Sequence, residues 1–134
     1  MGTVTSGLLD TSVLIAAESG RSLDTEALPA ELAASIITLA ELRTGVLTAS
    51  SPAERATRLR SLENVTRMKI FEADDRAAAQ WARLRVELRD RGRRMNVNDL
   101  WIAAIGVANG LPIVTQDADF DALIGIQGVE LIRV

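Results

Sequence analysis

The segment Thr5-Ser6-Gly7-Leu8-Leu9-Asp10-Thr11-Ser12 decides the fold, because a short apolar strand in it runs directly into an acidic residue. Residues 5–9 predict a buried strand, and residues 12–18 predict a first helix that ends at Ser19-Gly20. Further runs of strand length follow at residues 33–37, 68–71, 112–115 and 129–132. Short strands that alternate with helices predict an α/β sandwich, in which a central parallel sheet of four to five strands is flanked by helices.

The helices between these strands are predicted from capping residues and from apolar residues at helical spacing. A long amphipathic helix is expected before Gly92, an apolar helix before Asn109-Gly110, and a short helix between the last two strands. The residues expected to begin helices are Thr38, Ser51 before Pro52, Asp74 or Asp75, and Asn96 or Asn98.

Length and composition favour one domain. With 134 residues, of which 48% are hydrophobic, the sequence fits a single core. No apolar stretch approaches the roughly 20 residues of a membrane span, and the first residues lack the pattern of a signal peptide. We therefore expect one domain over residues 1–134 that works in the cytoplasm, without a membrane partner.

Three residue types that often carry chemistry are absent, since the chain contains no His, no Cys and no Tyr. Ser-His-Asp and Cys-His triads are excluded, and so are zinc sites built on sulfur or imidazole. An enzyme of this composition must use carboxylates, hydroxyls, amides and arginines. Carboxylate oxygens are hard ligands that suit Mg²⁺ or Mn²⁺.

Acidic residues stand where strands end and where helices begin. Asp10 and Asp117 each follow a predicted strand, while Glu41 and Asp99 lie in the first turns of helices. Each has a structural interpretation on its own, because Asp10, Asp117 or the neighbouring Asp119 can cap a helix and a first-turn acid stabilises the helix dipole. Together they indicate a site, because ligands gather at the carboxyl ends of parallel strands.

Carboxylates crowded at one sheet edge would not all stay ionised without cations between them. Divalent metal ions remove that repulsion, activate a water, and stabilise the attacking and leaving oxygens of an in-line phosphoryl displacement. The acidic constellation therefore indicates metal-assisted phosphoryl chemistry.

Four motifs, in chain order, resemble those of the PIN-domain ribonucleases. They are Leu8-Leu9-Asp10-Thr11-Ser12, Thr38-Leu39-Ala40-Glu41-Leu42, Asn98-Asp99-Leu100-Trp101-Ile102-Ala103-Ala104, and Val114-Thr115-Gln116-Asp117 followed by Asp119-Phe120. The match runs from residue 8 to residue 120, and its length and motif style are similar to the bacterial VapC toxins. The resemblance implies a PIN-like sandwich and an endoribonuclease, dependent on Mg²⁺ or Mn²⁺, that cleaves tRNA or ribosomal RNA.

The same resemblance assigns expected roles to individual residues and partners. It implies that a cognate VapB-like antitoxin silences the enzyme and that the chain forms a homodimer. Metal-binding acids are expected at Asp10, Glu41, Asp99 and Asp117, the last in preference to Asp119, with supporting hydroxyls at Thr11, Ser12 and Thr115.

Arginines are concentrated before the Asp99 motif, in a chain whose net charge is −3. Arg83, Arg85 and Arg89 are expected on a solvated helix face. The last three, Arg91, Arg93 and Arg94, approach the acidic motif, and we expect them to hold the RNA backbone.

Two other classes of protein that share some of these features do not fit the sequence. A response-regulator receiver needs a lysine after a late strand, but the only lysine is Lys69. A dinucleotide-binding domain would have a glycine-rich turn after the first strand, where this chain has Asp10-Thr11-Ser12. Two alternatives remain open: a non-catalytic PIN scaffold that binds RNA or protein, and a nuclease that is directed at DNA or at a nucleic-acid structure.

Overall fold

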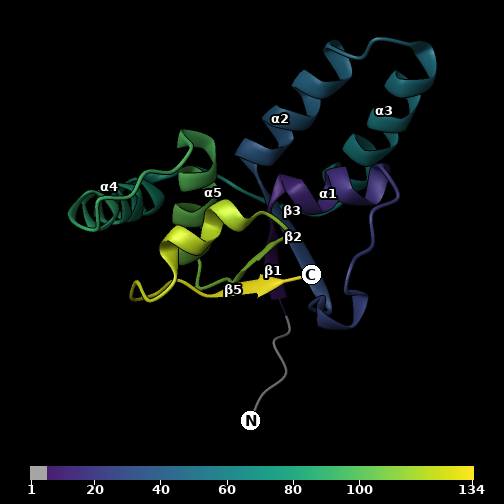
Figure 1. Ribbon diagram of the computed structural model, residues 1–134. Coiled ribbons are helices and arrows are strands. Elements are labelled where there is room, and N and C mark those ends of the chain that lie inside the picture. Colours follow the sequence, from purple (N-terminus) through teal and green to yellow (C-terminus); the bar gives the residue numbers. More distant parts are fainter. Residues whose placement is uncertain (1–5) are drawn as a thin grey trace.

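Five parallel strands form the centre of the protein in the computed structural model, which describes residues 6–134 (Figure 1). The strand order is β3-β2-β1-β4-β5, and each neighbouring pair is parallel. Thr5, expected in the first strand, lies outside the described residues. The strands are β1 (Ser6–Leu9), β2 (Glu31–Ser35), β3 (Lys69–Phe71), β4 (Ile113–Thr115) and β5 (Leu131–Arg133).

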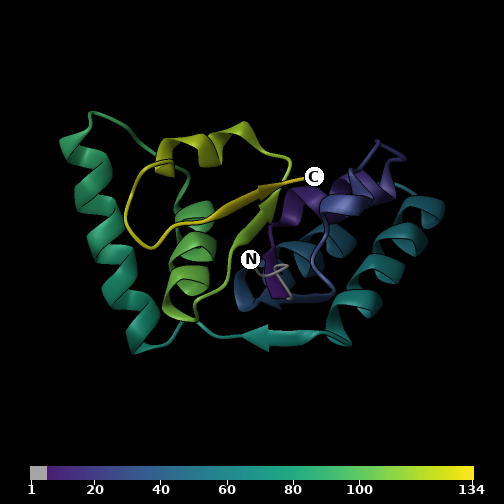
Figure 2. The same cartoon turned by 90° about the horizontal axis from the view of Figure 1, so that it is seen from below.

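Helices cover both faces of this sheet. Figure 2 shows α4 and α5 on one side and α1, α2 and α3 on the other. The α-helices are α1 (Thr11–Glu18), α2 (Ile36–Leu47), α3 (Pro52–Thr66), α4 (Asp75–Asp90) and α5 (Val97–Ala108). Two 3₁₀ helices complete the chain, η1 (Thr25–Ala27) and η2 (Ala118–Leu123).

Alternate residues of the strands supply the two hydrophobic cores. Leu8 and Ile113 pack in the core beneath α4 and α5, whereas Leu9 and Val114 pack in the core beneath the other three helices. Successive side chains of a strand point to opposite faces, so a continuous apolar run is what a sheet covered on both sides requires. The expected α/β sandwich is therefore confirmed.

The start of α2 differs from the expectation. The sequence predicts Ile36 and Ile37 in the second strand and Thr38 as the helix cap, but the helix already begins at Ile36. Ser35 is the N-cap, because its hydroxyl accepts a hydrogen bond of 3.1 Å from the Thr38 amide. That bond satisfies a backbone amide that has no partner within the helix. The stabilisation of the helix start outweighs the preference of Ile36 and Ile37 for a strand.

The fifth strand also lies later than the expected residues 129–132. A turn holds Val129, whose amide donates to the Ile126 carbonyl at 3.1 Å. Pairing with β4 therefore starts beyond that turn, where Leu131 stands opposite Ile113.

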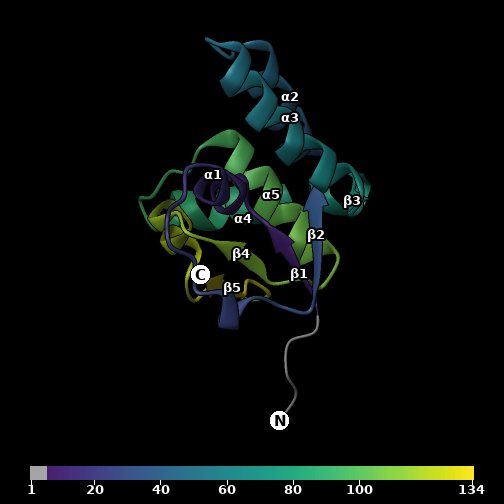
Figure 3. The ribbon, with the colours of Figure 1, turned by 90° about the vertical axis from the view of Figure 1, so that its right-hand side faces the viewer.

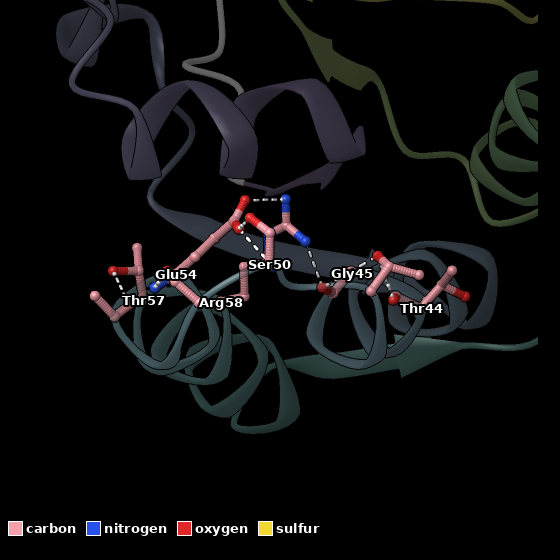
Figure 4. A network of polar contacts seen from close by, with 9 residues as sticks. Thr44, Gly45, Ser50, Glu54, Thr57 and Arg58 are labelled. Carbon is pink, nitrogen blue, oxygen red and sulfur yellow. Dashed lines mark hydrogen bonds and ion pairs between the residues drawn. The ribbon is translucent and has the colours of Figure 1, made fainter.

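α2 and α3 form a hairpin that extends away from the sheet (Figures 1 and 3). Its tip is closed by a polar cluster around Arg58 of α3 (Figure 4). The Arg58 guanidinium donates to the Gly45 carbonyl at 2.5 Å and pairs with Glu54 at 2.6 Å. Glu54 in turn accepts hydrogen bonds from the amide and hydroxyl of Ser50. The connection between the two helices is thus tied to both of them.

Among residues 6–134, no helix has the length and apolar character needed to cross a membrane.

Candidate metal centre

The predicted acids lie at the carboxyl edge of the sheet. Asp10 directly follows β1, and Asp117 lies two residues beyond β4, which is the neighbour of β1. Glu41 is in α2, and Asp99 is in the first turn of α5. Asn96 caps α5, because its side-chain oxygen accepts from the amides of Asn98 and Asp99, and the turn that carries Asp99 is thereby anchored.

Asp10 is buried, with 2% of its surface exposed. It occupies the N-cap position of α1, but its side chain accepts no capping hydrogen bond. One carboxylate oxygen, Oδ2, accepts instead from the hydroxyl of Ser12 at 2.6 Å and from that of Thr115 at 2.9 Å. Asp10 therefore holds the cap position that the sequence suggests but without a side-chain capping bond, and its other oxygen, Oδ1, is free of the two hydroxyl bonds.

Each of these two hydroxyls is itself held by the backbone. Ser12 Oγ accepts from the Gln116 amide at 3.1 Å, and Thr115 Oγ1 accepts from the Asp117 amide at 2.9 Å. Two backbone amides thus orient two hydroxyls toward one carboxylate. Burial raises the pKa of Asp10, and these hydrogen bonds act in the opposite direction by stabilising the charged form.

A second chain of hydroxyls ends on Glu41. Thr11 donates to the Glu41 carboxylate at 2.7 Å, and its oxygen lies 3.0 Å from the Thr38 hydroxyl. A hydroxyl has one proton, so Thr38 must be the donor in the second contact. Ser35 donates in turn to Thr38 at 3.5 Å. The chain of donors therefore runs from β2 to the acid on α2.

Asp99 is the electrostatic centre of the group. Its pKa is raised to about 7, first by burial and then by the negative charges of the surrounding acids. Those acids, in order of effect, are Asp10, Asp117, Glu41 and Asp119. Carboxylates that follow β1 and β4, together with that of Glu41 on α2, are therefore close enough to Asp99 to raise its pKa.

Both candidates for the last acidic position lie beside Asp99. Carboxylate oxygens of Asp99, Asp117 and Asp119 lie within 4.8 Å of one another. Asp117 also caps η2, since its Oδ1 accepts from the Asp119 amide at 2.8 Å. Its capping role and a ligand role are compatible, because a carboxylate has a second oxygen. The preference for Asp117 over Asp119 stays a prediction.

The three arginines expected near the site are separated by the fold. Arg91 donates to the Ile124 carbonyl at 2.9 Å, on the side of η2. Arg93 and Arg94 line a groove between α4 and the segment that leads to α5.

Sequence reasoning missed the polar residues that support the site from a distance. The sequence predicts Thr38 as a helix cap, whereas its hydroxyl donates toward Thr11. Gln116 was not singled out, although its side chain donates to the carbonyls of Ser22 and Val134 and holds the loop after β4. Their position next to acidic motifs was the available indication in the sequence.

Known proteins resemble this chain over most of its length. The profile of the PIN domain family matches residues 7–125. The chain is 53% identical to Ribonuclease VapC5 of Mycobacterium tuberculosis over 132 residues, which are 98% of each protein. It is 38% identical to Ribonuclease VapC4 of that organism over 124 residues, 92% of this chain and 95% of the relative.

A solved structure shares the fold over nearly the full length. It is VapBC-5 of Mycobacterium tuberculosis, described as a member of the VapBC family of toxin-antitoxin systems. The TM-score is 0.91 at 49% identity, with 97% of this chain and 99% of that chain covered.

Proposed function

The chain belongs to the PIN domain family, and we propose that it is a divalent-metal-dependent endoribonuclease that acts as a toxin of the VapC kind. The observation that carries the proposal is the crowding of four other acids around Asp99, at the sheet edge where α/β proteins bind ligands. Relatives named ribonucleases at 53% and 38% identity support RNA as the substrate.

The donor set fits Mg²⁺ or Mn²⁺. Its atoms are carboxylate oxygens, which are hard ligands, and three of the acids place oxygens within 4.8 Å of one another. We assign the binding role to Asp10, Glu41, Asp99 and Asp117, with Asp119 as the alternative to Asp117. A bound divalent cation would neutralise these carboxylates, activate a water and stabilise the charge that develops in phosphodiester cleavage.

The hydroxyls of this chain prepare the acids for that role. Ser12 and Thr115 fix the orientation of Asp10 and favour its charged form, and Thr11 donates a hydrogen bond that orients Glu41. Side chains that orient the ligands of a metal are generally needed for full affinity.

The first experiment separates a metal nuclease from a non-catalytic scaffold. Asp99→Asn removes a central negative charge but keeps the size of the side chain. Cleavage of bulk tRNA and rRNA should therefore be abolished, while the circular dichroism spectrum is unchanged. EDTA should stop the wild-type enzyme, and added Mg²⁺ should restore it. The matched control is Asp24→Asn, because Asp24 is exposed and its side chain makes no capping bond. Full activity of Asp99→Asn, or in EDTA, would refute the proposed site.

The products and the substrate test the reaction itself. Attack by water should leave 5′-phosphate and 3′-hydroxyl ends, which end-specific ligation detects. DNA strands of the same sequence should remain intact under the same conditions. Equal cleavage of DNA would favour the structure-directed nuclease over a ribonuclease.

We infer that a VapB-like antitoxin is the partner of this chain, because a solved relative is a toxin-antitoxin complex. A cationic side chain of that partner could neutralise the carboxylates in place of a metal without supplying its chemistry. Co-expression with the upstream reading frame should relieve growth arrest and give a stable complex. A chain that is harmless alone and has no co-purifying neighbour would refute the toxin role but not the nuclease.

The remaining parts of the proposal concern organisation. We infer one domain over residues 1–134, supported by two cores on opposite faces of one sheet. We also infer a homodimer and a cytoplasmic location, where tRNA and ribosomal RNA are met. Light scattering of the purified chain tests the homodimer, and fractionation of cells tests the cytoplasmic location.

A further inference from the structure

A groove of about 770 Å³ lies between the C-terminal half of α4 and the segment that leads to α5. Figure 1 shows α4 at the left of the molecule. Its lining contains four arginines and no acid. The lining residues are Arg85, Val86, Leu88, Arg89, Gly92, Arg93, Arg94, Met95 and Leu100.

The sequence builds this groove through helix spacing and one glycine. Arg85 and Arg89 are four residues apart and so lie on the same face of α4. Gly92 then has a φ of +67°, which favours glycine. The amide of Gly92 donates to the Arg89 carbonyl, and that of Arg93 to the Leu88 carbonyl at 2.9 Å, as in a Schellman C-cap. The chain therefore turns back at this point, and Arg93 and Arg94 join the two helix arginines.

The charges of these arginines are largely uncompensated. Arg93 and Arg94 have no ion pair or side-chain hydrogen bond within residues 6–134. The contact of Arg89 with Asp90 is 3.6 Å long, and both side chains are at least two-thirds exposed, so solvent weakens it. Arg85 lies 5.4 Å from the centre of the Trp81 ring, a contact that leaves its charge in place. Four like charges in one groove favour an anion.

We propose that this groove binds the phosphate backbone of the RNA substrate. The inference rests on the proposed ribonuclease function and extends it from the acidic centre to a second surface. An acidic centre repels a polyanion, so a nuclease with net charge −3 needs a separate cationic surface to hold RNA. Guanidinium groups match phosphate oxygens in geometry as well as in charge.

The position of the groove suits a continuous RNA path. Leu100 lines the groove, and its chain neighbour Asp99 is the centre of the acidic cluster. RNA held along α4 would thus pass the first turn of α5 on its way to the acids. This surface differs from the RNA-binding surface that the sequence predicts. It includes Arg85 and Arg89, which the sequence predicts on a solvated helix face, and it leaves out Arg91.

The test measures RNA binding apart from cleavage. In the Asp99→Asn background, Arg85→Gln/Arg89→Gln and Arg93→Gln/Arg94→Gln are compared with a control of equal charge change, Arg67→Gln/Arg76→Gln. Both control positions are exposed and outside the groove. Fluorescence anisotropy with labelled bulk tRNA gives Kd as a function of KCl concentration, and circular dichroism checks folding.

Each groove variant should lose affinity on the order of tenfold near 0.1 M salt, and the slope of log Kd against log salt should fall by about 1.5. The control should match the parent. Arg85→Lys/Arg89→Lys should keep the slope, because it keeps the charges.

Contrary outcomes are distinguishable. If the wild type cleaves RNA but the groove variants keep the control's slope of log Kd against log salt, the groove does not bind RNA. The proposed ribonuclease function would then still stand. Groove variants that bind tRNA normally but lose the co-purifying antitoxin would assign the groove to that partner and overturn the inference. A wild type that neither binds nor cleaves RNA would overturn both proposals.

Discussion

Asp99 is the residue at which the acidic centre reduces the free energy of unfolding. Its pKa rises from 3.8 to about 7 on folding, through burial first and then through its acidic neighbours. The folded state thus binds a proton that the unfolded chain releases between these values. The stability linked to that proton is fully present below the unfolded pKa and is lost as the pH rises through about 7.

The first prediction follows from this sign. In metal-free buffer, Asp99→Asn should gain stability relative to wild type as the pH rises from 5 to 8, by on the order of 2 kcal/mol at the upper end. Urea unfolding of both proteins at several pH values measures this difference in the free energy of unfolding. If the free energy of unfolding changes with pH in the same way in both proteins, Asp99 is not held among negative charges.

The second prediction concerns the hydroxyl that joins β4 to Asp10. Thr115→Val keeps the shape of the side chain but removes the donor to Asp10 and the acceptor of the Asp117 amide. Affinity for Mg²⁺ or Mn²⁺ should fall by about tenfold or more, as expected for a residue that orients a ligand. Calorimetric titration measures it. Thr66→Val, at an exposed threonine on α3, is the control and should bind as wild type does.

At the scale of elements, the α2–α3 hairpin has apolar contacts near the sheet and polar contacts around Arg58. Its helices carry few buried side chains, and Leu47 near the tip is 80% exposed. The Arg58 cluster in Figure 4 therefore has the task of holding α2 against the start of α3.

The third prediction is that Arg58→Ala loosens this hairpin locally. Removing the guanidinium frees the Gly45 carbonyl at the end of α2 and leaves Glu54 without its cation. Amides of residues 45–55 should exchange hydrogen faster, while amides of β1 and β4 keep their protection, because those strands are in the core. Arg60→Ala on the same helix, which removes only a bond to Thr57, is the matched control. Equal exchange in both variants would show that the cluster does not hold the hairpin.

At the scale of the whole molecule, charge is separated more strongly than the net value of −3 suggests. Five acids meet at the carboxyl edge of the sheet, while four arginines line the groove beside α4. One surface therefore attracts cations and the other attracts anions.

The fourth prediction is that a divalent cation stabilises the whole fold through the acidic edge. Mg²⁺ at about 100 times its Kd should raise the free energy of unfolding by about 2.7 kcal/mol, which is several degrees in Tm. Asp10→Asn and Asp99→Asn should lose most of this gain, and Asp24→Asn should keep it. A Tm that does not respond to Mg²⁺ at pH 8 would contradict the assignment of these acids as ligands.

The sequence alone determined the class of fold and the acids of the centre. Apolar runs of strand length separated by helical spacing are local patterns, and a sheet covered on both faces is the arrangement that buries them. Asp10 and Asp117 could be placed together because each follows a strand, and parallel strands end at the same edge.

Sequence reasoning already predicted supporting hydroxyls at Thr11, Ser12 and Thr115, but only the tertiary structure decided which acid each of them serves. Thr115 donates to Asp10 across 105 positions of the chain, and Thr11 to Glu41 across 30. The same holds for the arginines, since the turn at Gly92 sends Arg93 into the groove while Arg91 bonds to η2. A local motif can thus point to a polar residue, but the partner that this residue meets depends on strand register and helix packing, which arise from the burial of the whole core.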